Sequence, residues 1–212
     1  MFEYSKALQY PVKIARPNAR LAKAVMSQLG GPNGELGASM RYLNQRYAMP
    51  IRELSGLLTD IGTEELSHME MVSAIVTQLT KGLTPAEIEA QGFTDYYTDH
   101  TLGIYPVNAG GIPFSAETFQ SVGDPIADLN EDLAAEQKAR TTYDNILRIA
   151  DDPDVRDVIR FLREREIVHY QRFGEGLRLL QEYLQKHSPD PQNPYSYNPS
   201  FDTPPMRPQP RR

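Results

Sequence analysis

Apolar residues recur every three or four positions over a long stretch in the first half of the chain. From Ile51 onward they fall at Leu54, Leu57, Leu58, Ile61, Leu66, Met69, Val72, Ile75, Val76 and Leu79. This is the period of one face of an α-helix. The pattern therefore predicts one long amphipathic helix over residues 51–79.

The same periodicity predicts the other long helices at 32–48, 126–150 and 154–186. Pro50 separates the first two helices, and Asp151-Asp152-Pro153 separates the last two, with the Asp residues as helix caps. A shorter helix is expected over 18–29, with Asn18 as its N-cap. Since only a short turn joins the helices within each pair, we expect two antiparallel pairs, 32–48 with 51–79 and 126–150 with 154–186.

Residues 80–125 are rich in glycine and tyrosine, and only one short helix is expected there, at about 84–91. A connection of this length is typical of a chain that crosses a helix bundle from end to end. The predicted fold class is therefore all-α: a ferritin-like four-helix bundle with one long crossover connection.

The two ends of the chain differ in composition from the bundle. Residues 1–17 contain Pro11 and Pro17 around an alternating stretch, which predicts an extended N-terminal arm. Eight of the 17 prolines fall in residues 187–212, which predicts a Pro-rich extended or disordered tail. The bundle domain is accordingly expected to span residues 18–186.

Composition narrows the chemistry. The chain has no cysteine, which excludes disulfides, thiolate metal sites and thiol nucleophiles. Its net charge of −6 and the lack of a basic cluster argue against a nucleic-acid partner. No stretch approaches the roughly 18 apolar residues that a membrane span needs, and no signal peptide is recognisable. We therefore expect a cytoplasmic protein that has neither nucleic acid nor a membrane as a partner.

Two of the four histidines share a motif and a spacing. His68 and His169 each follow a glutamate by three residues, Glu65 and Glu166, so that each Glu and His lie on one helix face. A further glutamate precedes each motif by 30 residues: Glu35 before Glu65, and Glu136 before Glu166. In an antiparallel helix pair with legs of equal length, such residues lie at the same level.

Each half of the bundle thus supplies one Glu and one Glu-x-x-His motif. Together the halves offer four carboxylates and two imidazoles, the ligand set of di-iron and di-manganese carboxylate proteins. Hard oxygen donors with a little imidazole suit Mn or Fe, and these donors alone do not separate the two metals. The predicted metal ligands are Glu35, Glu65, His68, Glu136, Glu166 and His169.

Several segments resemble the manganese (non-haem, dimanganese) catalase family over about residues 1–185, close to its spore-coat branch. They are Leu29-Gly-Gly-Pro-Asn-Gly-Glu35, Asp60-Ile-Gly-Thr-Glu-Glu65-Leu-Ser-His68-Met-Glu-Met, Ala134-Ala-Glu136-Gln-Lys-Ala-Arg140 and Arg163-Glu-Arg-Glu166-Ile-Val-His169. The resemblance implies an enzyme that disproportionates hydrogen peroxide to water and oxygen at two Mn ions per chain. It also implies a homo-oligomer, typically a hexamer, with the arm and the tail at interfaces.

The resemblance assigns roles by motif position. Glu35 and His68 would bind one Mn, Glu136 and His169 the other, and Glu65 would bridge them. Glu166 matches a glutamate that lies beside the metals and moves protons; whether it also coordinates stays open. Tyr42 matches an outer-shell tyrosine, with an ordinary core tyrosine as the alternative.

The sequence departs from the family at two positions near the site. Some relatives carry a basic residue just before the third glutamate or two turns after it, where this chain has Ala135 and Tyr143.

Two other functions stay open. One is a di-iron ferritin-like protein, either a ferroxidase or a peroxide reductase of the rubrerythrin kind; the absence of cysteine counts against the latter. The other is a spore-coat or assembly protein whose metal site is structural, which the arm and the tail favour. The spore coat is accordingly a second expected location, beside the cytoplasm.

Overall fold

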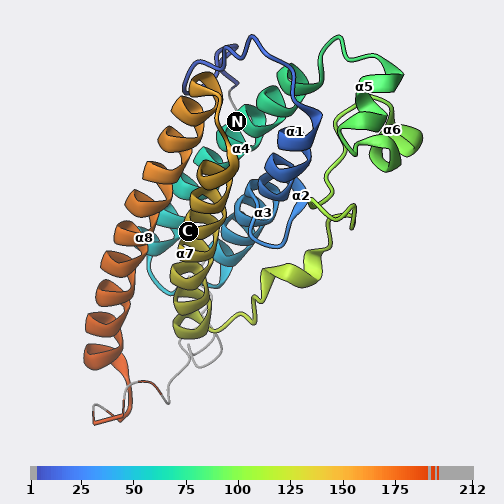
Figure 1. The fold of residues 1–212 in the computed structure, drawn as a ribbon. Helices are drawn as coiled ribbons and strands as arrows, with labels where there is room; N and C mark the ends of the chain where they lie inside the picture. Colours follow the sequence, from blue (N-terminus) through green and yellow to red (C-terminus); the bar gives the residue numbers. More distant parts are fainter. Residues whose placement is uncertain (1–3, 191, 194, 196–212) are drawn as a thin grey trace, which may run out of the picture.

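In the computed structural model, residues 4–190, 192, 193 and 195 are described. They contain helices and no strand beyond one isolated bridge, between Val107 and Pro113. The bundle consists of α3 (Glu35–Gln45), α4 (Arg52–Thr80), α7 (Pro125–Ile149) and α8 (Pro153–His187). Figure 1 shows these four helices packed side by side, with α3 and α4 forming one antiparallel pair and α7 and α8 the other. The predicted all-helical bundle is confirmed.

The helix ends follow from local capping. The Asp124 side chain accepts hydrogen bonds from the first turn of α7, and Asp152 accepts one from the backbone N–H of Asp154 at the start of α8. A proline follows each of these caps, at the position where its missing N–H costs nothing. The expectation that Asp residues cap the last helix is therefore confirmed.

The chain before the bundle differs from the prediction of one helix over 18–29. It forms two short helices, α1 (Ala19–Val25) and α2 (Ser27–Gly30), which meet at Met26. The Asn18 side chain caps α1, as expected. The next helix begins at Glu35 rather than Pro32, because residues 31–34 form a turn in which Gly34 is extended.

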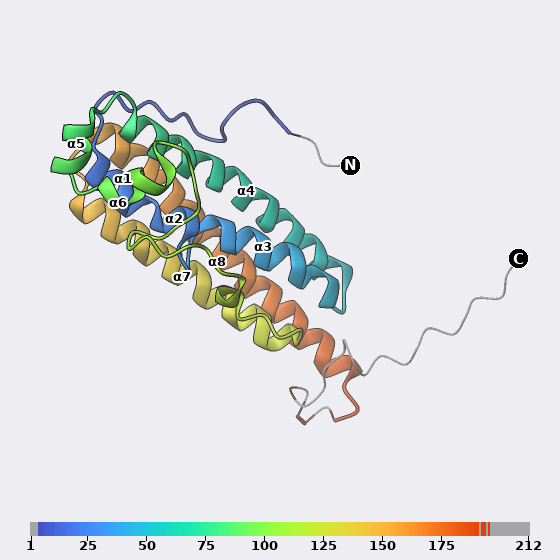
Figure 2. The same cartoon turned by 90° about the vertical axis from the view of Figure 1, so that its right-hand side faces the viewer.

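The connection from Thr80 to Pro125 runs along the bundle from one end to the other (Figure 2). It contains the expected short helix as α5 (Pro85–Ala90), which starts with a capping box between Thr84 and Glu87. It also contains α6 (Thr94–His100) and the 3-10 helix η2 (Ala116–Phe119). A second 3-10 helix, η1 (Arg46–Ala48), lies outside the connection, directly after α3. The prediction of a single helix in this connection was wrong, because α6 presents a mostly polar, tyrosine-containing sequence without a clear apolar period.

The N-terminal arm lies along α4 and α8. The Tyr10 ring stacks on Phe161 with ring centroids 4.5 Å apart, and Val12 and Ile14 are buried. The Gln78 side chain accepts from the backbone N–H of Ile14 and donates to the carbonyl of Val12. Most of the predicted tail lies outside the described residues.

Two apolar clusters fill the bundle, and a polar layer separates them. Along α4, Leu54, Leu58 and Ile61 belong to one cluster, while Met71 and the apolar residues after it belong to the other. Along α8 the same division falls between Leu162 and Phe173. The Glu-x-x-His motifs occupy the gap on both helices, so packing on either side holds them at one level. Among the described residues, none of the helices combines the length and the hydrophobicity that a membrane span needs.

Candidate metal centre

Four helices deliver the six predicted ligands to one place inside the bundle. Glu35 is the first residue of α3, Glu65 and His68 lie in the middle of α4, Glu136 lies in α7, and Glu166 and His169 lie in α8. Every one of these side chains is buried, with at most 1% of the residue exposed. The equal spacing in the two halves therefore does place these residues at the same level.

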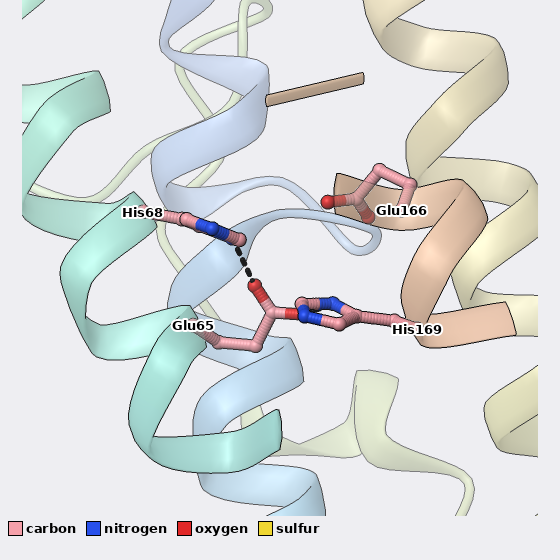
Figure 3. Close-up of side chains that lie close together, drawn as sticks. All are labelled: Glu65, His68, Glu166 and His169. Carbon is pink, nitrogen blue, oxygen red and sulfur yellow. Dashed lines mark hydrogen bonds and ion pairs between the residues drawn. The ribbon is translucent and has the colours of Figure 1, made fainter. Parts of the chain in front are cut away.

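The two Glu-x-x-His motifs face one another across the bundle (Figure 3). Ligand atoms of Glu65, His68, Glu166 and His169 all lie within 4.8 Å of one another. The two imidazole rings are nearly parallel, with centroids 5.6 Å apart. This cluster is compact enough to surround a metal ion.

Glu65 lies between the two histidines. One of its carboxylate oxygens, Oε2, is 2.6 Å from Nδ1 of His68, and the other, Oε1, is 2.8 Å from Nδ1 of His169. Each oxygen of a single carboxylate thus faces the inner nitrogen of a different imidazole. A carboxylate in this position can bridge two cations.

Glu35 and Glu136 each lie near one of the two histidines. Oε2 of Glu35 is 3.9 Å from Nδ1 of His68, and Oε2 of Glu136 is 3.6 Å from Nδ1 of His169. The arrangement therefore repeats in the two halves: one terminal glutamate, one histidine and a shared Glu65.

Buried polar atoms in the cluster test whether metal would fit. Oε1 of Glu65, Oε2 of Glu136, Oε1 of Glu166 and Nδ1 of His169 have no hydrogen-bond partner among the described residues. Buried polar atoms are normally paired, and Nδ1 of His169 lies close to Oε1 of Glu65 without hydrogen-bond alignment. Cations at the centre would satisfy all four atoms, so the residues fit a metal site of oxygen and imidazole donors.

The carboxylates influence one another strongly. Burial, followed by the charges of neighbouring carboxylates, raises the pKa of Glu35 and Glu166 well above the usual range. Burial opposes ionisation of Glu65 as well, but the charges of His169 and His68 outweigh it and lower the pKa of Glu65 below the usual range. Burial would lower the pKa of His68, but the charge of Glu65 raises it to about 9.

Each terminal glutamate also accepts a hydrogen bond from a buried tyrosine. The hydroxyl of Tyr42 donates to Oε1 of Glu136, and the hydroxyl of Tyr143 donates to Oε1 of Glu35. Tyr42 is thus both a core residue, packed on Phe173, and a hydrogen-bond donor to a predicted ligand.

Glu64 is a functional candidate that the sequence reasoning missed. Its Oε1 is 3.5 Å from Nε2 of His68, and its Oε2 is 3.1 Å from Nε2 of His169. Arg165 donates to both of its oxygens, at 2.7 and 3.1 Å, and Gln9 of the arm donates to Oε1. Its position four residues before His68, on the same helix face, was the signal available in the sequence.

A small cavity of about 10 Å³ adjoins the centre between α3 and α7. The exposed Pro32 lines it together with Ala135, Ala139, Glu136 and Glu166. Ala135 therefore borders a space beside Glu166. The other two histidines are elsewhere: His100 stacks on Tyr105 in the crossover, and His187 ends α8.

Comparisons with known proteins identify the family of the chain. A family model described as manganese containing catalase matches residues 1–204. Protein CotJC of Bacillus subtilis is 52% identical over 186 residues, which cover 88% of this chain and 98% of that protein. A probable manganese catalase of Clostridium acetobutylicum is 38% identical and covers 84% of this chain and 80% of its own length.

A solved structure has the same fold. The crystal structure of KatB, a manganese catalase from Anabaena PCC7120, superposes with a TM-score of 0.79 at 30% sequence identity, covering 85% of this chain and 81% of that chain. The family model and the relatives, together with the Glu and Glu-x-x-His set of each half, show that this chain belongs to the manganese-containing catalase family.

Proposed function

We propose that this chain is a manganese catalase, which converts two molecules of hydrogen peroxide into two of water and one of oxygen. The observation that carries the proposal is the position of Glu65, whose two carboxylate oxygens face Nδ1 of His68 and Nδ1 of His169. A site for one ion has no need of this symmetry. In a site for two ions, a carboxylate between the two histidines could bind one ion with each of its oxygens.

Five residues would hold two Mn ions, with Glu166 beside them. Glu35 and His68 would bind one ion, Glu136 and His169 the other, and Glu65 would lie between them. A bound manganese pair supplies two units of redox change, as many electrons as one peroxide gives or takes. The four carboxylates balance two divalent cations, which makes burial of so many charged groups tolerable.

Glu166 is the proposed proton carrier. It is buried, it faces the centre from α8, and it lines the cavity beside Ala135 and Ala139. Its raised pKa, caused by burial and then by Glu35 and Glu65, favours the protonated form in the protein without metal. As a carboxylate, this group could accept one of the two protons released when a peroxide is oxidised to oxygen, and as a carboxylic acid it could return that proton when the next peroxide is reduced to water.

Tyr42 and Glu64 orient the proposed metal ligands. Tyr42 holds Glu136 through its hydroxyl group, and Glu64 faces the outer nitrogen of both imidazoles. The cavity has room for about one water molecule. We further propose a homohexamer in which the arm and the tail contribute to subunit contacts, located in the cytoplasm or the spore coat.

Metal analysis combined with oxygen measurement tests the proposal. Purified protein is stripped with a chelator, reloaded with Mn(II) or Fe(II), and given peroxide at an oxygen electrode. We expect about two Mn per chain and rapid oxygen release, which Glu65→Ala abolishes. Two Fe without oxygen release would favour a ferroxidase, and little metal without oxygen release would favour a structural coat protein.

A second test separates the proposed proton carrier from the ligands. Glu166→Gln keeps an oxygen toward the centre but cannot carry the carboxyl proton. We expect the variant to retain most of its Mn and to lose about 100-fold or more in the rate of oxygen release, within the range for general acid–base groups. Loss of one Mn per chain would instead make Glu166 mainly a ligand.

A further inference from the structure

Two buried tyrosines occupy equivalent positions in the two halves of the bundle. Tyr42 follows Glu35 by seven residues in α3, and Tyr143 follows Glu136 by seven residues in α7. Both rings are fully buried. Seven residues are about two helical turns, so each tyrosine lies on the same helix face as the glutamate of its own half.

The hydrogen bonds of these tyrosines cross between the halves. The helices α3 and α7 run in opposite directions (Figure 1), so the tyrosine of each helix can reach back to the glutamate of the other. Tyr42 accordingly donates to Glu136, and Tyr143 donates to Glu35. Tyr143 is therefore the counterpart of Tyr42 in the second half.

In both cases the tyrosine hydroxyl donates a hydrogen bond to Oε1 of the glutamate, while Oε2 faces a histidine. Oε2 of Glu35 is 3.9 Å from Nδ1 of His68, and Oε2 of Glu136 is 3.6 Å from Nδ1 of His169. We infer that Tyr143 is a positioning residue, which holds Glu35 so that one oxygen is presented to the ion shared with His68. The inference rests on the proposed dinuclear site and assigns one tyrosine to each ion.

The chemistry of a phenol suits this position. The Tyr143 hydroxyl group supplies a hydrogen-bond donor without adding a positive charge. The four buried carboxylates already balance two divalent ions. A neutral donor fixes Glu35 while leaving that balance intact.

Binding of Mn(II) to the chelator-stripped protein tests the inference. The variants are Tyr143→Phe, Tyr42→Phe and, as a control, Tyr96→Phe, whose hydroxyl group bonds the carbonyl of Gly103 in the crossover. Free Mn(II) is measured by electron paramagnetic resonance during titration. We expect Tyr143→Phe and Tyr42→Phe each to lower the affinity for one of the two Mn(II) ions by about 10–100-fold, the usual effect of losing a hydrogen-bond partner of a metal ligand. Tyr96→Phe should bind both ions like the wild type.

A Glu35→Gln background identifies the ion affected. The tight ion left in that background is the one bound by Glu136 and His169. Adding Tyr143→Phe should change its dissociation constant by less than about two-fold, as for independent sites, whereas adding Tyr42→Phe should weaken it about 10–100-fold. Thermal melts of the metal-free variants check that each has folded.

Three outcomes would overturn the inference. The first is a Tyr143→Phe variant that binds both ions like the wild type, and the second is weakening of the remaining ion when Tyr143→Phe is added to Glu35→Gln. In both, normal Mn binding by the wild type leaves the proposed function standing. The third is a wild-type protein that binds no Mn(II), which would overturn the proposed function together with the inference.

Discussion

Glu64 and Glu65 are neighbours in the sequence, but their side chains lie on opposite sides of the same two imidazoles. Glu65 faces both Nδ1 atoms from within the centre, and Glu64 lies near both Nε2 atoms. A negative group near Nε2 favours a proton there, which leaves Nδ1 free to bind metal. Arg165 and Gln9 in turn fix Glu64 from outside.

This arrangement predicts the effect of Glu64→Gln. An amide offers one oxygen and one NH₂ group, so it can present an acceptor to only one of the two Nε2 atoms. We expect Mn(II) affinity to fall by about 10–100-fold, measured by titration of stripped protein. Glu53→Gln, an exposed position on the same helix, is the control. Unchanged affinity in Glu64→Gln would show that Glu64 does not orient the histidines.

At the scale of elements, close helix packing sets the distance between the ligands. A Cβ atom at Gly62 would lie 2.8 Å from Cγ of Leu43 and 3.2 Å from its backbone nitrogen, so α3 and α4 approach closely one turn before Glu65. Gly56, on the same helix, has no atom within 4 Å of such a Cβ. The two glycines therefore respond oppositely to the same substitution.

We expect Gly62→Ala to destabilise the protein by about 1–3 kcal/mol through overpacking. Gly56→Ala should stabilise it by about 0.5–1 kcal/mol, because alanine favours the helix. Denaturant unfolding of the metal-free proteins measures both changes. Equal effects of the two substitutions would contradict the close approach of α3 and α4.

Much of the bundle could be predicted because its long helices bury apolar stripes of regular period, and their lengths bring Glu35 level with Glu65 and Glu136 level with Glu166. The α6 helix could not be predicted, because it lies outside the bundle and its polar sequence has no apolar stripe of regular period. Glu64 was missed because its role depends on two helices meeting. The reciprocal bonds of Tyr42 and Tyr143 likewise follow from the packing of α3 against α7, which no local pattern contains.

At the scale of the whole molecule, the centre concentrates buried charge between the two apolar clusters. Four carboxylates and two histidines lie within it, and metal ions supply the compensating positive charge. Metal binding should therefore contribute to folding stability, because the unfolded chain does not assemble the site.

This linkage predicts a manganese-dependent melting temperature. With Mn(II) at about 100 times its dissociation constant, each site adds about 2.7 kcal/mol, which corresponds to roughly 5–10 °C for a domain of this size. Calorimetry of stripped protein with and without Mn(II) measures the shift, and Glu65→Ala should show much less of it. Mg(II) is the control ion, since it favours all-oxygen sites. An equal shift with both ions would indicate non-specific cation binding.

The most direct test of the account is the electron paramagnetic resonance spectrum of protein loaded with two Mn(II) ions per chain. If both ions share the Glu65 carboxylate, the spectrum should be that of a magnetically coupled pair of Mn(II) ions. Glu65→Ala should convert this spectrum into the six-line signal of isolated ions. A wild-type spectrum of isolated Mn(II) ions at full loading would contradict the dinuclear centre.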